Sequence, residues 1–138
     1  MGRILAIDFG MKRTGLAVSD PLRIIAGALE TVSTAELERW IEGYVAKNEV
    51  DTIVVGKATR LDGSPSDTLP HAEGLVRRLA KRYPDKEVTM YDERFTSVMA
   101  QRTIRESGIG KMARRDKSLV DKVSATIILQ GYMESKNF

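Results

Sequence analysis

The chain has 138 residues, of which 42% are hydrophobic and 30% charged. This composition is typical of one soluble globular domain, which we expect to span residues 1–138. The absence of cysteine excludes a disulfide scaffold and a thiolate metal site. No apolar run reaches the roughly 20 residues that cross a bilayer, and no signal-peptide pattern opens the chain, so we expect a cytoplasmic protein without a membrane partner. The net charge of +3 permits a polyanionic partner but does not by itself indicate one.

The first half of the chain reads as three strands with short connections, then a helix and a fourth strand. Apolar runs and turn residues predict strands at 3–9, 14–20, 24–32 and 51–56 and a helix at about 35–47. We expect the third strand to be irregular near Gly27. Thr34 is the expected N-cap of the helix. Trp40 and Tyr44 share the apolar stripe of that helix, so we expect them in the core.

The second half combines two loops, three helices and one strand. Residues 57–69 are polar and rich in turn signals, which predicts a loop. We predict a helix at about 69–83, a strand at 86–91, a third helix ending near residue 106, a basic loop at 107–118 and a last helix at about 118–134. On the helix at 69–83 we expect the inward residues to be Leu75, Val76, Leu79 and Ala80. On the last helix, the residues in register on one face are Leu119, Val123, Thr126, Ile127 and Gln130.

The order of these elements predicts an α/β fold. A short connection between the first two strands favours an antiparallel hairpin, whereas a helix between two strands favours a parallel pair with a right-handed crossover. We therefore predict one mixed five-stranded sheet in the spatial order 3-2-1-4-5, flanked by helices. Strands one, four and five would be parallel, and strand two would be antiparallel to them.

Three acidic residues are expected at one edge of this sheet. Asp8 ends the first strand, Glu93 follows the fifth strand, and Asp121 lies in the first turn of the last helix. Carboxylates gathered closely repel one another unless a cation neutralises them, and an oxygen-only ligand set favours Mg²⁺ or Mn²⁺. Such a site suits phosphoryl chemistry, in which metal ions activate water and stabilise the leaving oxygen.

Each acid also has a purely structural interpretation. Asp8 could pair with Lys12 or Arg13 in the turn that follows it. Glu93 could form an ion pair with a neighbouring base, and Asp121 could stabilise the helix N-terminus through the helix dipole. Because three acids from distant parts of the chain are expected at one edge, we favour the metal role for Asp8. For Glu93 and Asp121 the residues alone leave both interpretations open.

Basic residues near these acids suit a polyanion. The expected nucleic-acid contacts lie in the first turn and in the loop at 107–118, and they are Lys12, Arg13, Lys111, Arg114, Arg115 and Lys117. A second basic cluster, Arg77, Arg78, Lys81 and Arg82, lies on the predicted helix at 69–83. That cluster is equally well interpreted as a solvated helix face.

Four motifs together resemble one known family. They are Ile7-Asp8-Phe9-Gly10 with residues 15–20, Val54-Val55-Gly56 with Asp62-Gly63, Asp92-Glu93-Arg94-Phe95-Thr96, and Val120-Asp121-Lys122 with residues 125–130. In this combination and spacing, nearly the whole chain resembles the YqgF/RuvX family of RNase H-like Holliday junction resolvases and pre-16S rRNA nucleases. The resemblance implies an RNase H-like fold, magnesium-dependent nuclease activity and a metal-binding triad at Asp8, Glu93 and Asp121. The chain departs from the family pattern at residues 57–60, where the family has a Leu-Pro-containing stretch followed by Asn.

These observations predict a divalent-metal-dependent nuclease that hydrolyses phosphodiester bonds in structured nucleic acid. The substrates would be branched DNA or precursor rRNA, with the ribosome as a further partner, and the protein would be a monomer or weak homodimer. A non-catalytic nucleic-acid-binding or ribosome-assembly factor on the same fold is the second hypothesis. A third, a nucleotide-handling protein of the actin/hexokinase type, requires two such lobes, whereas this chain supplies one.

Overall fold

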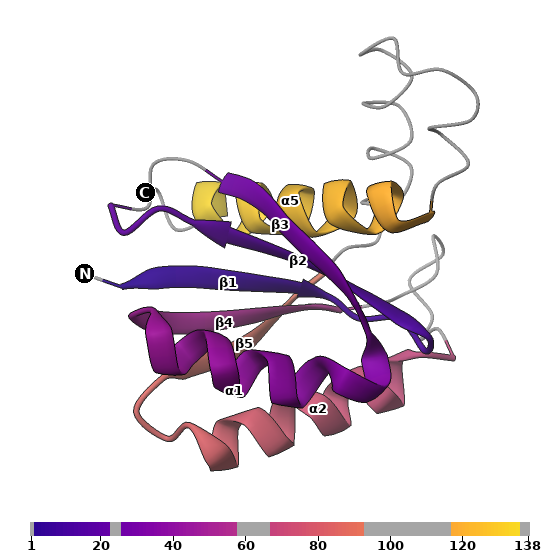
Figure 1. Cartoon of the computed structure of the whole chain (residues 1–138), viewed down its shortest axis with the longest axis horizontal. Helices are drawn as coiled ribbons and strands as arrows, with labels where there is room; N and C mark the ends of the chain where they lie inside the picture. Colours follow the sequence, from indigo (N-terminus) through magenta and orange to yellow (C-terminus); the bar gives the residue numbers. More distant parts are fainter. Residues whose placement is uncertain (1, 23–25, 58–66, 93–116, 136–138) are drawn as a thin grey trace, which may run out of the picture.

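A sheet between two layers of helix forms the protein (Figure 1). The computed structural model describes residues 2–22, 26–57, 67–92 and 117–135. The strands are β1 (Arg3–Asp8), β2 (Arg13–Ser19), β3 (Ala26–Ser33), β4 (Val50–Lys57) and β5 (Glu87–Asp92). The helices are the short 3-10 turn η1 (Thr34–Glu36) and α1 (Leu37–Lys47), α2 (Leu69–Arg82) and α5 (Lys117–Ser135). The predicted helix before residue 106 and residues 107–116 of the predicted loop at 107–118 lie outside the described residues. The last two residues of that loop, Lys117 and Ser118, belong to α5.

The predicted sheet topology is confirmed. The strand order is β3-β2-β1-β4-β5, with β2 antiparallel to β1 and to β3, and with β4 parallel to both β1 and β5. Helices α1 and α2 provide the long connections that parallel neighbours require. The carboxyl ends of β1, β4 and β5 therefore meet at one edge of the sheet, which we call the carboxyl edge.

Strand β1 is buried on both faces, and successive side chains supply two separate cores. Leu5 and Ile7 pack with residues of α1 and α2 in one core, whereas Ile4 and Ala6 pack with residues of α5 in the other. This alternation is the period of two that any strand imposes on its side chains. It explains why the sequence of β1 is almost continuously apolar, as expected for a central strand with helices on both faces.

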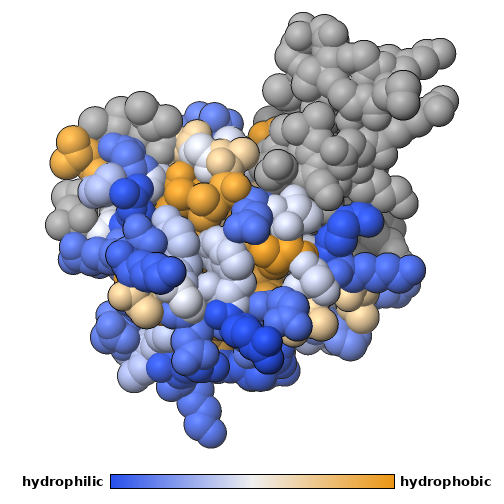
Figure 2. Space-filling view, viewed as in Figure 1, coloured by the Kyte–Doolittle hydropathy of each residue, from blue (hydrophilic) through white to orange (hydrophobic). Residues whose placement is uncertain are grey.

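Helices α1 and α2 lie side by side over the first core and are joined at their surface by ion pairs. A Glu38 carboxylate oxygen lies 3.2 Å from Arg78 Nε, and Glu42 Oε2 lies 2.6 Å from Arg82 Nη2. Two members of the basic cluster on α2 are therefore engaged with α1, which agrees with the interpretation of the cluster as a solvated face. Figure 2 shows that the surface over α1 and α2 is mostly hydrophilic, with smaller hydrophobic patches.

Several local predictions need correction. Thr34 does not cap α1 but begins η1, and no side-chain cap is present at either helix start. The irregularity of β3 falls at Leu29, because Leu16 pairs with Glu30 while Ala17 pairs with Ala28. Ala80, expected in the core, is exposed on α2.

The sheet-facing side of α5 also differs from the prediction. Where the burial of α5 is described, over residues 124–134, the buried apolar residues are Ala125, Ile128, Leu129, Tyr132 and Met133. Ile127, expected in the core, is only half-buried. Apolar residues occur on several sides of α5, so helical period alone does not select one of them. Packing against β1, β2 and β3 selects the side that includes Ala125.

Trp40 and Tyr44 reach the core only in part. Their rings stack with centroids 5.0 Å apart and pack against the edge of the first core. The indole Nε1 of Trp40 donates a hydrogen bond of 3.0 Å to Glu30 of β3. Both rings thereby hold α1 against the edge strand.

Within the described ranges, no helix is long and apolar enough to cross a membrane.

Candidate active site

Asp8 occupies the carboxyl end of the central strand. Its backbone is opposite Gly15 of β2, and its neighbour Ile7 is opposite Val55 of β4. Asp8 follows the alternation of Ile4 and Ala6, so it belongs to the face of the sheet that α5 covers. Its side chain is half-buried, and a carboxylate in that setting retains access to water and to a bound cation.

The turn after Asp8 is held from the far side by Thr34. The backbone N–H of Thr34 donates to the carbonyl of Lys12 at 3.0 Å, and its hydroxyl donates to the carbonyl of Gly10 at 2.6 Å. The same hydroxyl lies 2.9 Å from the hydroxyl of the fully buried Thr14. Thr34 is therefore a support for the turn beside Asp8, which the sequence did not reveal because its position suggested a helix cap.

Glycine is required at position 10 by the closeness of the returning chain. A Cβ there would overlap the carbonyl oxygen of Arg13. The turn brings Lys12 and Arg13, both exposed, to the carboxyl edge within five residues of Asp8. These two predicted nucleic-acid contacts thus lie on the surface next to the predicted metal ligand.

The other predicted site residues are described in part or not at all. Asp121 lies on α5, one helical turn before Ala125, which packs against the sheet. In Figure 1, the N-terminal end of α5 and the arrowhead of β1 lie toward the same side of the molecule. Lys117 is the first residue of α5. Glu93 and the basic residues Lys111, Arg114 and Arg115 lie outside the described residues.

Among the described residues, Asp8 supplies a carboxylate at this edge, and a carboxylate suits a hard cation. His71, which is the one histidine of the chain, lies on α2 and therefore on the opposite face of the sheet from α5. The one histidine therefore does not share the face of the sheet to which Asp8 belongs, and the chain has no cysteine to supply a thiolate. Hard cations such as Mg²⁺ and Mn²⁺ prefer carboxylate oxygens. Among the described residues no group of three or more potential ligands is assembled.

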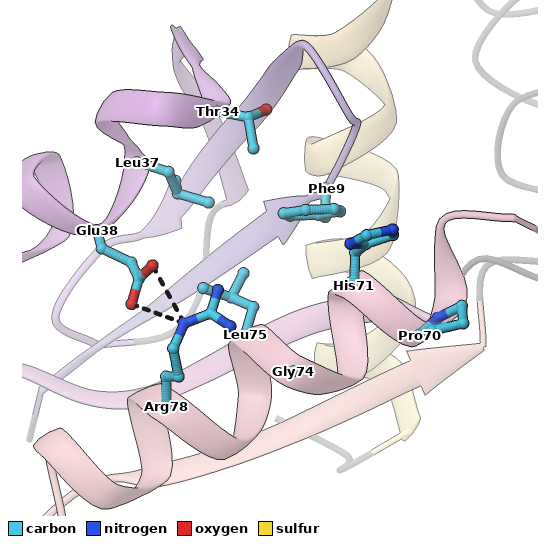
Figure 3. A pocket seen from close by; sticks show the side chains of 9 residues that line it. All are labelled: Phe9, Thr34, Leu37, Glu38, Pro70, His71, Gly74, Leu75 and Arg78. Carbon is cyan, nitrogen blue, oxygen red and sulfur yellow. Dashed lines mark hydrogen bonds and ion pairs between the residues drawn. The ribbon is translucent and has the colours of Figure 1, made fainter.

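A small cavity opens on the other face of the same edge, and the sequence analysis did not predict it. Its volume is about 200 Å³, and its lining comes from the turn after β1, from η1 and α1, and from α2. The lining residues are Phe9, Thr34, Leu37, Glu38, Pro70, His71, Gly74, Leu75 and Arg78 (Figure 3). Because distant segments form it, no local motif predicts it.

Two solved structures with similar folds are of Holliday junction resolvases. The T. thermophilus RuvC, solved in complex with a Holliday junction substrate, matches with a TM-score of 0.59 at 18% identity, covering 99% of this chain and 96% of that one. The fowlpox virus Holliday junction resolvase matches with a TM-score of 0.57 at 16% identity, covering 97% of this chain and 99% of the other. The fold is therefore that of the RuvC-like, RNase H-fold resolvases.

Sequence comparison identifies the family within this class. A relative from Bacteroides thetaiotaomicron, named "Putative pre-16S rRNA nuclease", is 52% identical over 138 residues and covers the whole of both chains. A relative of the same name from Porphyromonas gingivalis is 53% identical over 135 residues, or 98% of each chain. The family model RuvX, Holliday junction resolvase, matches residues 2–135. The chain belongs to the RuvX family, and the predicted family and fold are confirmed.

Proposed function

We propose that this member of the RuvX nuclease family is a divalent-metal-dependent endonuclease with Asp8, Glu93 and Asp121 as its metal ligands. The observation that carries the proposal is the position of Asp8. Its half-buried carboxylate ends the central strand of a resolvase fold, on the face covered by the helix that contains Asp121.

Mg²⁺ is the proposed cofactor, with Mn²⁺ as a substitute of similar ligand preference. A metal held by these carboxylates would lower the pKa of an attacking water and neutralise charge on the leaving oxygen. The chain itself supplies three further functions. Gly10 and Thr34 fix the turn that follows Asp8, and Lys12 and Arg13 would contact phosphates next to the scissile bond. Lys111, Arg114, Arg115 and Lys117 would hold the backbone further away.

Precursor 16S rRNA is the proposed first substrate, because curated relatives that carry that substrate in their name are about half identical to this chain along its whole length. Branched DNA is the second candidate, favoured by the family description and by the fold shared with junction-binding resolvases. We propose that the protein acts on ribosomal precursors as a monomer or as a weak homodimer.

A cleavage assay tests the proposal. A precursor 16S rRNA fragment and a four-way DNA junction are incubated with Mg²⁺ and with wild-type protein, Asp8→Asn or Asp85→Asn. The control Asp85→Asn removes the same charge from an exposed residue before β5, at the opposite edge of the sheet. Asp8→Asn should lose more activity than the roughly 10–100-fold that follows loss of an outer-shell partner of a metal. The control should cleave at the wild-type rate, and equal cleavage by all three proteins would remove Asp8 from the site.

The cleavage assay and a separate ATP titration distinguish the rival functions. A non-catalytic assembly factor would bind both nucleic acids in a salt-sensitive manner without metal-dependent cleavage. A nucleotide-handling protein would instead bind ATP in a titration that lacks nucleic acid. Metal-dependent cleavage by the wild type, lost in Asp8→Asn, contradicts both.

A further inference from the structure

The cavity lined by Phe9, which we call the Phe9 cavity, has the dimensions and walls of a site for a flat ring. Its volume is about 200 Å³, and a cavity of ~150 Å³ is sufficient to hold a benzene ring. Figure 3 shows the rings of Phe9 and His71 at one end and the ion pair of Glu38 with Arg78 at the other. An apolar ring face and a charged far end thus occur within one small space.

The far end of the cavity offers both kinds of hydrogen-bonding group. Both carboxylate oxygens of Glu38 accept from the single Nε–H of Arg78 at 3.2 Å, and both side chains are about half exposed. A carboxylate accepts hydrogen bonds from exocyclic amino groups, and a guanidinium donates to carbonyl oxygens and ring nitrogens. Exocyclic amino groups, carbonyl oxygens and ring nitrogens all occur on the edge of a nucleobase. An aliphatic ligand has none of them and would leave the hydrogen-bonding groups of Glu38 and Arg78 unused.

Gly74 keeps part of the wall of this cavity open. It lies in the interior of α2, where glycine weakens a helix relative to alanine. A Cβ at this position would lie 3.3 Å from Nη1 of Arg78, and a longer side chain would occupy space that belongs to the cavity. A residue that disfavours the helix therefore stands where a side chain would reduce the volume of the site.

The cavity adjoins the proposed metal site. Phe9 directly follows Asp8, so their Cα atoms are about 3.8 Å apart. The carboxylate belongs to the α5 face of the sheet and the phenyl ring packs with the α1 and α2 core. A nucleic-acid strand with its phosphate at Asp8 would pass over the carboxyl edge, and an adjacent base could enter the cavity from the other face.

We propose that the Phe9 cavity binds one unpaired nucleobase of the substrate, stacked on Phe9 and His71 with its polar edge toward Glu38 and Arg78. The proposal rests on the proposed nuclease function, because that function supplies the nucleic acid. It narrows the substrate class to structured nucleic acid with an unpaired nucleotide next to the scissile phosphate. Unstacked bases are commonly bound in this manner by aromatic side chains.

A stacking probe tests the proposal without cleavage. A short single-stranded RNA with one 2-aminopurine is titrated with protein in EDTA, since stacking quenches the fluorescence of this base. Wild-type protein should quench it, and an otherwise identical RNA that lacks the base should bind about tenfold more weakly, or about 1.4 kcal/mol. Gly74→Leu fills the cavity and should remove both the quenching and that difference in affinity. The matched control Ala80→Leu adds the same side chain at an exposed position of α2 outside the cavity, and it should behave as wild type.

Substitutions of His71 provide a second measurement that does not depend on filling the cavity. His71→Ala should reduce the quenching, and His71→Phe, which restores a ring, should recover it. Asp85→Asn, which removes a charge from an exposed residue at the opposite edge of the sheet, should quench like the wild type. Equal affinity for the two RNAs, or quenching that persists in Gly74→Leu, would overturn the cavity proposal even where metal-dependent cleavage is intact. Loss of cleavage with normal quenching would instead refute the nuclease function alone.

Discussion

The hydroxyl of Thr34 connects the turn after Asp8 to the start of α1, and replacing Thr34 with valine removes that connection. Valine retains the branched shape and the backbone N–H that donates to Lys12. It loses the hydrogen bonds to the carbonyl of Gly10 and to the hydroxyl of Thr14. Two hydrogen bonds at a net value of about 0.5–1.5 kcal/mol each give an expected loss of about 1–3 kcal/mol in the free energy of unfolding.

Urea denaturation measures this loss. With a slope of about 2 kcal/mol per molar urea, a loss of about 2 kcal/mol lowers the unfolding midpoint by about 1 M. Thr34→Ser retains the hydroxyl and should lie much closer to the wild type. In the double variant with Thr14→Val, the cost should be smaller than the sum of the single costs, because Thr14 and Thr34 share one hydrogen bond. An unchanged midpoint for Thr34→Val would refute this account of the turn.

Three further predictions concern α2 and its contacts. Leu79→Ala should cost about 2–5 kcal/mol in a thermal or urea melt, because Leu79 is fully buried in the first core. Arg82→Ala should cost at most about 1 kcal/mol in the same melt, since its ion pair with Glu42 is about half exposed and screened by salt; a cost equal to that of Leu79→Ala would contradict this ranking. Burial raises the pKa of Tyr83 above its ordinary value of 10.0, although the charge of Arg82 acts in the opposite direction. As the pH rises, the tyrosine therefore loses its proton in the unfolded chain before it does so in the folded one. The resulting contribution to stability is present below pH 10 and is lost as the pH rises through the folded-state pKa. The Tyr83 hydroxyl has no hydrogen-bond partner among the described residues, so Tyr83→Phe should be at least as stable as the wild type at pH 8. Between pH 9 and 11 its free energy of unfolding should fall less than that of the wild type. An equal fall in both proteins would exclude Tyr83 as the cause.

The sheet was predictable because its signals are local and unambiguous. The apolar run of β1 requires burial on both faces, and the short turn before Arg13 permits only an antiparallel return. Each crossover helix then forces a parallel neighbour, which fixes the order β3-β2-β1-β4-β5. The position of Asp8 at the carboxyl edge was predictable for the same reason, since it is the acid that ends the central strand.

The features that failed prediction depend on contacts between distant segments. Thr34 has the residue type of a helix cap, yet its hydroxyl bonds to Gly10, 24 positions away. Ile127 of α5 was expected in the core but is only half-buried, because the helix is apolar on several sides and the sheet selects Ala125 and Leu129. The Phe9 cavity exists because three segments meet, and no stretch of sequence contains it.

The central claim is that Asp8, Glu93 and Asp121 hold a divalent metal ion. A crystal of the full chain soaked in Mn²⁺ tests it most directly, since the anomalous signal of manganese locates the ion independently of the protein. The account predicts manganese bound by carboxylate oxygens of all three residues in the wild type, and loss or displacement of that peak in Asp8→Asn. Manganese bound elsewhere, with the three carboxylates far apart, would contradict it.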